Sequence, residues 1–194
     1  MEMVASGIEL NGKVYHESGD FHVCLWDYKS RNEGRGNFVW VSVDDMTQDE
    51  IMEMMSDYGK EVTKETGELH EDVFISDTEN LPGKSHDFDP TMPEDIARFF
   101  EVAKDSYLEI DAISAGVSCD IPLESIEDSF VYQTTDDDPW YDYAYHCVDE
   151  GLMGEVADNS LKNYIDYAAI GRDLSIEHTL DYVNGTYYIF TRNY

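Results

Sequence analysis

The chain has 194 residues and a formal charge of −31, from 43 acidic and 12 basic side chains. Chains this acidic are often disordered, but 42% of these residues are hydrophobic and 13% are aromatic, which is enough to build a core. A negative field repels nucleic acid and anionic membranes, so the charge excludes direct binding to either and favours a basic partner.

The N-terminal part of the chain shows strand and helix patterns. An alternating segment at 21–28 predicts a strand, and 37–43 predicts its antiparallel partner across a turn at 32–36. Thr47 and Glu50 form a capping-box pattern, which predicts a helix of about twelve residues. On that helix one face is apolar and the opposite face is acidic; the acidic residues are Asp49, Glu53 and Asp57.

The middle of the chain begins with a third strand, predicted at 72–76. The segment 79–90 is rich in residues that break helices and strands, so it is the first expected domain boundary. Thr91 and Glu94 repeat the capping-box pattern and predict another helix start. Two further short helices are predicted, at 106–116 and 122–128.

The C-terminal part combines strands with helices. Residues 129–135 predict a strand, and helices are expected over 138–151 and 165–174. The end of the chain predicts a β-hairpin, because Asn184-Gly185 is the favoured pair for a tight type I′ turn between alternating strands.

The predicted helix over 138–151 lies in the most acidic part of the chain. Between Lys104 and Lys162 there are fifteen acidic residues and no Lys or Arg. At 100° per residue, one side of the helix is apolar and aromatic, with Trp140, Tyr143, Ala144 and Cys147. The opposite side carries Asp138, Asp142 and Asp149 within an arc of about 40°. A solvated helix face explains one such helix, but the chain-wide excess of acid favours a negative surface that serves a function.

Other chemistries leave little trace in the sequence. An EF-hand loop starting at Asp136 fails at its fifth, sixth and twelfth positions, and no spaced Cys or His pairs suggest zinc. Neither a phosphate-binding glycine loop nor a nucleophile motif is present. The three scattered cysteines suit a reducing cytoplasm, and no apolar run has the length of a signal peptide or a membrane span. We therefore expect no catalytic, metal or cofactor site and a cytoplasmic protein that is not an enzyme.

One C-terminal segment carries a family resemblance. Residues 151–179 resemble the C-terminal signature of the antirestriction protein ArdA, and the matching positions are Leu161, Asn163 to Tyr167, Ala169 and Gly171 to Leu174. Residues 71–83 resemble the segment that closes the family's first domain, and 136–150 lie where the family has an acidic antirestriction region. The resemblance covers about residues 21–194 and is strongest at 148–174.

The resemblance implies both a fold and a function. It implies an α+β chain of three small domains, elongated and homodimeric, which is similar to DNA in shape and charge. It further implies that the carboxylates stand in for phosphates in the DNA groove of type I restriction-modification enzymes, and that the protein protects incoming mobile DNA without catalysis. We expect an N-terminal β-sheet plus helix over 1–84, a helical domain over 85–126, and C-terminal helices with a small antiparallel sheet over 127–194.

The expected partner-binding surface is spread over many carboxylates. Its residues are Asp49, Glu53, Asp57, Glu124, Glu127, Asp128, Asp136, Asp137, Asp138, Asp142, Asp149, Glu150, Glu155 and Asp158. Two alternatives stay open at this point. One is an acidic mimic or chaperone for another basic partner, such as a nucleoid or other defence protein. The other is an enzyme or cation-binding protein whose acidic residues are incidental.

Overall fold

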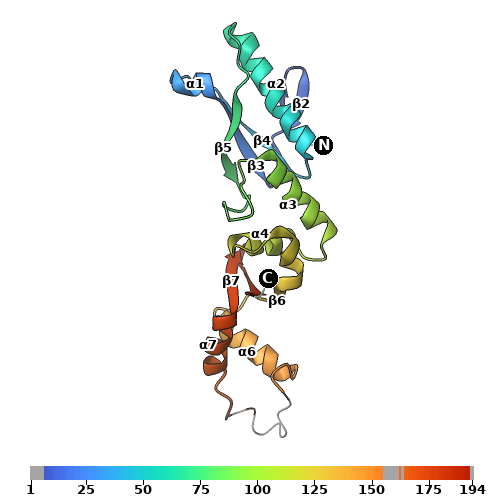
Figure 1. Cartoon of the computed structure of the whole chain (residues 1–194), viewed down its shortest axis with the longest axis vertical. Coiled ribbons are helices and arrows are strands. Elements are labelled where there is room, and N and C mark those ends of the chain that lie inside the picture. The colour runs from blue at the N-terminus through green and yellow to red at the C-terminus, as the bar shows by residue number, and fades with distance from the viewer. Residues whose placement is uncertain (1–6, 155–161, 163, 193–194) are drawn as a thin grey trace, which may run out of the picture. The chain divides into compact units, whose positions relative to one another are not determined.

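The computed structural model describes residues 7–154, 162 and 164–192 (Figure 1). These residues form helices and three small antiparallel sheets, of two, three and three strands, so the expected α+β class is confirmed. The chain divides into two compact units. Unit 1 comprises residues 1–84 and 88–105, and unit 2 comprises 85–87 and 106–194.

Unit 1 contains the first two sheets. Its strands are β1 (Gly7–Leu10), β2 (Lys13–His16), β3 (His22–Asp27), β4 (Phe38–Ser42) and β5 (Val73–Glu79). Its helices are α1 (Tyr28–Asn32), α2 (Gln48–Thr66) and α3 (Pro93–Asp105). Strand β3 lies between β4 and β5 and is antiparallel to both, so the three strands predicted here are confirmed.

The core of unit 1 lies between its three-stranded sheet and α2. Val23 and Leu25 on β3 are fully buried, as are Ile51 and Met54 on α2. The capping box of α2 is present, because Thr47 accepts from the backbone of Glu50 and Glu50 accepts from the backbone of Thr47. The helix is nevertheless 19 residues long, so the expected length of about twelve was wrong.

Three features of unit 1 differ from the sequence prediction. A turn lies within 32–36 as expected, but the short helix α1 that precedes it was not predicted, and the Asp27 side chain accepts from the backbone N–H of Ser30 at its start. Helix α3 begins at Pro93, so Thr91 is not its N-cap, and Thr91 instead donates to Asp89. The β1–β2 hairpin was missed, although Asn11-Gly12 is the same turn signal as the one near the C-terminus.

Unit 2 is built on the third sheet, in which β8 lies between β6 and β7. Its strands are β6 (Phe130–Thr134), β7 (His178–Val183) and β8 (Thr186–Thr191). Its helices are α4 (Ile110–Ser118), η1 (Leu123–Ser125), α5 (Ile126–Ser129), α6 (Pro139–Asp149) and α7 (Tyr167–Glu177). The predicted elements are all present, but α4 and α7 begin and end later in the chain than expected. Asn184 and Gly185 both have positive φ, 48° and 91°, which confirms the type I′ hairpin.

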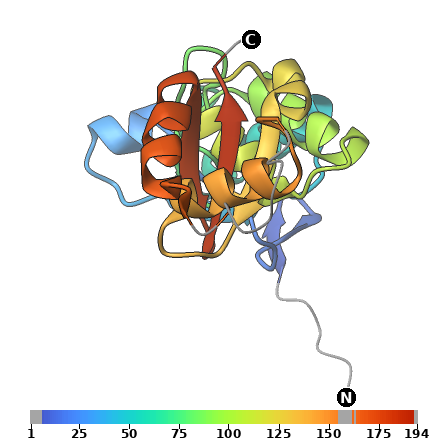
Figure 2. The ribbon, with the colours of Figure 1, turned by 90° about the horizontal axis from the view of Figure 1, so that it is seen from below.

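Helices α6 and α7 lie side by side in unit 2 (Figure 2). Tyr143 and Cys147 of α6 pack against Ile189 in the centre of the sheet. Ala144 and Val148, also on α6, pack against Tyr167 at the start of α7. The apolar side predicted for α6 is therefore confirmed as core.

Gly171 determines how closely α7 approaches α6. A Cβ atom at this position would lie 2.6 Å from the carbonyl oxygen of Trp140. We expect Gly171→Ala to lower the free energy of unfolding by about 1–3 kcal/mol, the usual cost of overpacking, although alanine favours a helix. Chemical denaturation measures this change. The matched control is Gly83→Ala, where a Cβ meets nothing within 4 Å. Equal stability of the two variants would contradict the close contact.

None of the helices among the described residues is long and apolar enough to cross a membrane.

Candidate partner-binding acidic surface

The acidic face of α2 is only partly exposed. Asp49 and Glu53 are exposed, as expected, but Asp57 is 2% exposed. Its carboxylate accepts hydrogen bonds from the Asn11 side chain (3.0 Å), the Tyr15 hydroxyl (2.8 Å) and the Lys60 ammonium (2.9 Å). Burial raises the pKa of this carboxyl group, but these three bonds outweigh it and hold the pKa below its usual value. Asp57 is therefore a structural residue, and its assignment to the acidic surface was wrong.

The β1–β2 hairpin covers much of this helix face. Lys13 forms an ion pair with Glu53, and the backbone N–H of Asn11 donates to Glu61 at 2.9 Å. Together with the bonds to Asp57, these contacts give hydrogen-bond or ion-pair partners to three carboxylates, those of Glu53, Asp57 and Glu61, along two turns of α2. The sequence prediction missed these contacts because helical spacing carries no information about donors that the fold brings from a distant segment.

The three aspartates expected on the outer side of α6 are not bare. Asp138 is the N-cap, and its carboxylate accepts from the backbone N–H of Tyr141 at 3.1 Å. Asp142 is half-buried and accepts from the Tyr132 hydroxyl at 3.0 Å. Burial and this bond raise the pKa of Tyr132 to about 12.

Asp149, at the end of α6, is paired with a lysine. Its carboxylate lies 2.6 Å from the ammonium of Lys162, and that hydrogen bond holds the pKa of Asp149 below its usual value. All three aspartates therefore bond within the fold as well as carrying charge. Of the three, Asp149 is the one that a basic side chain among the described residues pairs with.

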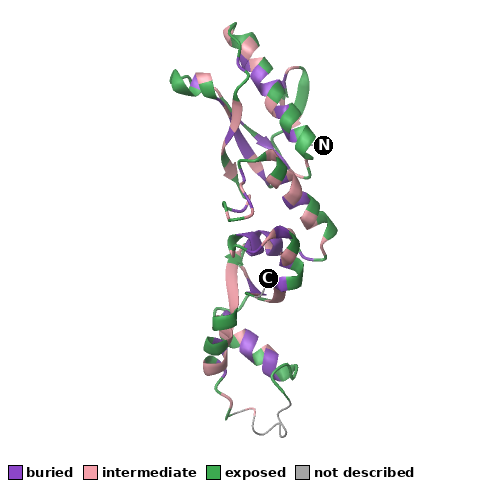
Figure 3. Cartoon of the chain, viewed as in Figure 1, coloured by how far each residue is buried: buried purple, intermediate pink, exposed green. Residues whose placement is uncertain are grey.

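Other predicted carboxylates of unit 2 are exposed. Along α6, exposed residues recur at every fourth position between buried ones, and exposed residues continue into both flanking segments (Figure 3). Asp136 is exposed and accepts from the backbone of Asp138, and Glu124 is exposed on η1. No hydrogen bond or ion pair joins the carboxylates of four other exposed residues to the described part of the chain: Glu127, Asp128, Asp137 and Glu150. These four are named the open carboxylates below. Glu155 and Asp158 lie outside the described residues.

The described residues contain little that resembles a reactive centre. No three His, Cys, Asp or Glu side chains among them gather as a metal-binding group. Cys24 and Cys147 are buried, and Cys119 is half-buried. Burial raises the pKa of both Cys119 and Cys147, which keeps these thiols protonated at neutral pH.

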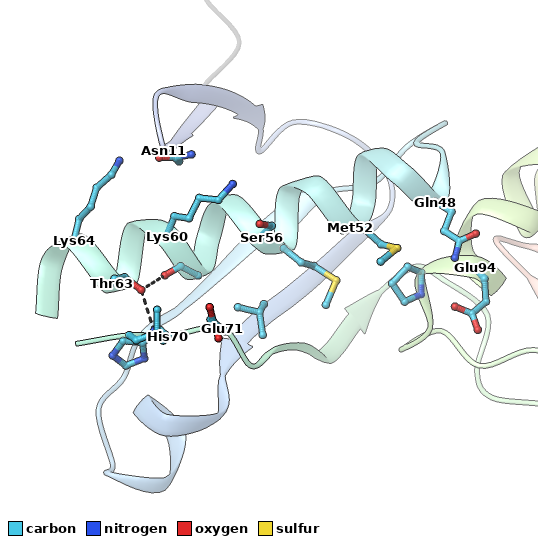
Figure 4. Close-up of a pocket in the computed structure, with 15 residues that line it drawn as sticks. Asn11, Gln48, Met52, Ser56, Lys60, Thr63, Lys64, His70, Glu71 and Glu94 are labelled. Atoms are coloured by element: carbon cyan, nitrogen blue, oxygen red, sulfur yellow. Dashed lines mark hydrogen bonds between the residues drawn. The ribbon is translucent and has the colours of Figure 1, made fainter. Parts of the chain in front are cut away.

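A hollow of about 770 Å³ runs along α2 (Figure 4). Met52, Met55 and Val73 contribute apolar surface to it. The two lysines on its rim already have partners, since Lys60 binds Asp57 and Lys64 binds Glu61. Thr63 also bonds within the fold, to Gly59 and His70. The lysines are therefore not free to hold an anionic ligand, and the other charged side chains that line the hollow, Glu71 and Glu94, are acidic.

The fold and the surface together define a class of protein: an acidic α+β protein whose exposed carboxylates, rather than a reactive pocket, form its most distinctive surface. The family model described as antirestriction protein (ArdA) matches residues 23–189. The match spans most of the chain, so the chain belongs to the ArdA family, and the predicted resemblance is confirmed. Membership implies an antirestriction function in a family that is not known for catalysis. A comparison with curated proteins gives no match.

Proposed function

We propose that this protein blocks type I restriction-modification enzymes by occupying their DNA-binding groove in place of DNA. The open carboxylates are the observation that carries the proposal, because they leave charge available to a partner after the fold has satisfied its own bonds. Duplex DNA carries one charge per about 1.7 Å of its axis. A formal charge of −31 therefore equals that of about 50 Å of duplex.

The proposed assembly is a homodimer, and the proposed location is the cytoplasm, where the protein would protect incoming mobile DNA. Two such chains would carry the charge of about 30 base pairs. In unit 2, Tyr188 and Phe190 of the terminal hairpin are buried and Tyr187 is half-buried, but Tyr182 is 56% exposed and packs against Tyr187. The three-part division at 1–84, 85–126 and 127–194 also stays a proposal.

Direct competition tests the proposed mechanism. Increasing amounts of the protein should displace a labelled DNA duplex from a purified type I enzyme, with one inhibition constant for DNA binding and for cleavage. Retention of DNA on the enzyme at saturating protein would contradict groove occupation. Inhibition of a different basic DNA-binding protein under the same conditions would favour the alternative of an acidic mimic for another partner.

Salt should weaken this protein's binding to the enzyme less steeply than it weakens DNA binding. DNA binding gains free energy from release of counterions that are condensed on phosphates. Carboxylates on separate side chains carry less dense charge, and Glu53 and Asp149 are already paired with Lys13 and Lys162, so fewer counterions are released. The measurement is both dissociation constants between about 50 and 300 mM salt, compared as log-log slopes. A slope near zero for the protein would show that apolar contacts hold the complex.

A further inference from the structure

Helix α2 carries a second apolar stripe beside the one that faces the core. The core stripe consists of the buried residues Ile51, Met54, Tyr58 and Val62. At 100° per residue, Met52, Met55 and Gly59 fall within an arc of about 60° next to it, and all three line the hollow along α2. A surface helix ordinarily has polar residues away from its core side, so this second stripe is a face suited to a further packing partner.

The wall of the hollow opposite α2 comes from the segment that leads into β5. Gly59 lets this segment approach the helix, because a Cβ atom there would lie 2.7 Å from the carbonyl oxygen of His70 and 3.2 Å from the Val73 side chain. Leu69, in the same segment, also lines the hollow and is 67% exposed, and Met52 on α2 is 54% exposed. Large apolar side chains are therefore exposed on both walls.

The charge that is free in this hollow is negative. Glu71 and Glu94 are exposed, and no hydrogen bond or ion pair joins either carboxylate to another described residue. Glu94 lies toward the Gln48 end of the hollow and Glu71 toward the Thr63 end (Figure 4). The two lysines on the rim are bound to carboxylates of α2 itself. The hollow therefore favours an occupant that combines apolar surface with basic groups.

The lining residues extend over about four turns of α2. From Gln48 to Lys64 the helix rises about 24 Å, which a partner helix of about sixteen residues would span. Unbranched methionine side chains adapt to the surface laid against them, and grooves lined by methionine bind amphipathic helices. A second copy of this chain is a poor occupant, because it would bring a chain of charge −31 against Glu71 and Glu94.

We propose that the hollow along α2 is a docking groove for a basic amphipathic helix of a partner protein. The apolar stripe of that helix covers Met52, Met55 and Leu69, and its lysine or arginine residues bind Glu71 and Glu94. The groove is separate from the open carboxylates, and the proposal does not depend on the inhibition of restriction enzymes. Because apolar contacts hold the helix, the association persists at a salt concentration that screens exposed charges.

A synthetic helical peptide of about sixteen residues, with leucines on one side and lysines on the other, is the probe. NMR of the full chain with labelled methionine methyl groups detects binding at about 300 mM salt, where general attraction to an acidic protein is screened. The signals of Met52 and Met55 should shift, whereas that of Met153 in unit 2 should not. A peptide of the same composition, with its leucines distributed around the helix, should bind at least about tenfold more weakly.

A double substitution of exposed apolar residues tests the apolar contribution. Met52→Gln with Leu69→Gln should lower the affinity for the helical peptide at least about tenfold, because two side chains no longer bury apolar surface. Met153→Gln is the matched control, since Met153 is 53% exposed and lies outside the hollow. All three side chains are exposed, so the thermal unfolding temperature should hardly change in either variant.

A second double substitution tests the charged contribution. Glu71→Gln with Glu94→Gln should lower the affinity about two- to tenfold, since each exposed charge contributes little to a contact. Glu9→Gln with Glu17→Gln makes the same change in charge on exposed residues of unit 1 outside the hollow and should lower the affinity less.

Several results would overturn the proposal. One is equal binding of the two peptides, and another is unchanged affinity in the variant Met52→Gln with Leu69→Gln. Equally tight binding of a peptide in which glutamate replaces every lysine would also overturn it. So would shifts of the Met52 and Met55 signals that depend on protein concentration without any peptide, because they would assign the groove to a second copy of this chain.

Discussion

Removing the charge of all four open carboxylates is expected to weaken inhibition of the target enzyme by about fourfold to nearly a thousandfold. Each exposed charge contributes about 0.2–1 kcal/mol to a contact, so a single change has a small effect and four changes add up. The changes are Glu127→Gln, Asp128→Asn, Asp137→Asn and Glu150→Gln. None of these carboxylates bonds to another described residue, so the thermal unfolding temperature should hardly change. The measurement is the inhibition constant against DNA cleavage.

A matched control separates the surface from the net charge. Four exposed carboxylates of unit 1, outside the predicted surface, provide the same change in charge: Glu9→Gln, Glu17→Gln, Glu71→Gln and Asp72→Asn. Neutralising these four control residues should weaken inhibition much less than neutralising the four open carboxylates does. If both sets of four weaken it equally, total charge rather than the position of the open carboxylates determines binding. If one single substitution abolishes inhibition in a folded protein, a localised site explains the function better.

The second large effect is expected at a buried pair that the sequence prediction did not contain. His70 and Asp27 are 3% and 0% exposed, and the Nδ1 atom of His70 lies 2.5 Å from the Asp27 carboxylate. The same carboxylate accepts the backbone N–H of Ser30 at 2.7 Å, which caps α1. Asp27 thus joins strand β3, helix α1 and the segment after α2 at one point.

Asp27→Asn is expected to lower the free energy of unfolding by about 1–3 kcal/mol, because a neutral amide accepts more weakly from His70 and Ser30 than a carboxylate does, and its NH2 group would be buried where the Asp27 Oδ1 atom has no partner among the described residues. Burial raises the pKa of Asp27, but the bonds from Ser30 and His70 outweigh it, so the pKa lies below its usual value. A carboxyl group whose pKa is lowered by folding stabilises the folded state at pH values above its unfolded pKa, about 3.9 for Asp. This stabilisation is lost as the pH falls through the pKa of the folded state. The difference between wild type and variant should therefore shrink below about pH 4.

Denaturation at pH 7 and at acidic pH measures both effects. Asp72→Asn is the control, since it changes the same charge on an exposed residue nearby and should alter stability by less than about 0.5 kcal/mol. A variant Asp27→Asn as stable as this control at pH 7 would show that the pair contributes nothing to the fold.

Local sequence chemistry predicted much of the secondary structure. The Thr47–Glu50 capping box and the Asn184-Gly185 turn depend on residues next to one another, and both are present. The core side of α6 also followed from helical spacing. The Thr91–Glu94 pattern failed because a capping box requires the helix to begin directly after its first residue, whereas α3 begins at Pro93.

The charge, the α+β class and the family of this protein follow from the amino-acid sequence alone, because each depends on composition, on short-range spacing or on a contiguous motif. Which carboxylates are open depends on the three-dimensional fold. Asp57 is buried and accepts hydrogen bonds from Asn11 and Tyr15, which are 46 and 42 residues away in the chain. Asp149 is paired with Lys162 at a separation of 13 residues. A carboxylate's availability depends on which donors the fold brings to it, and helical periodicity contains no information about donors from distant segments.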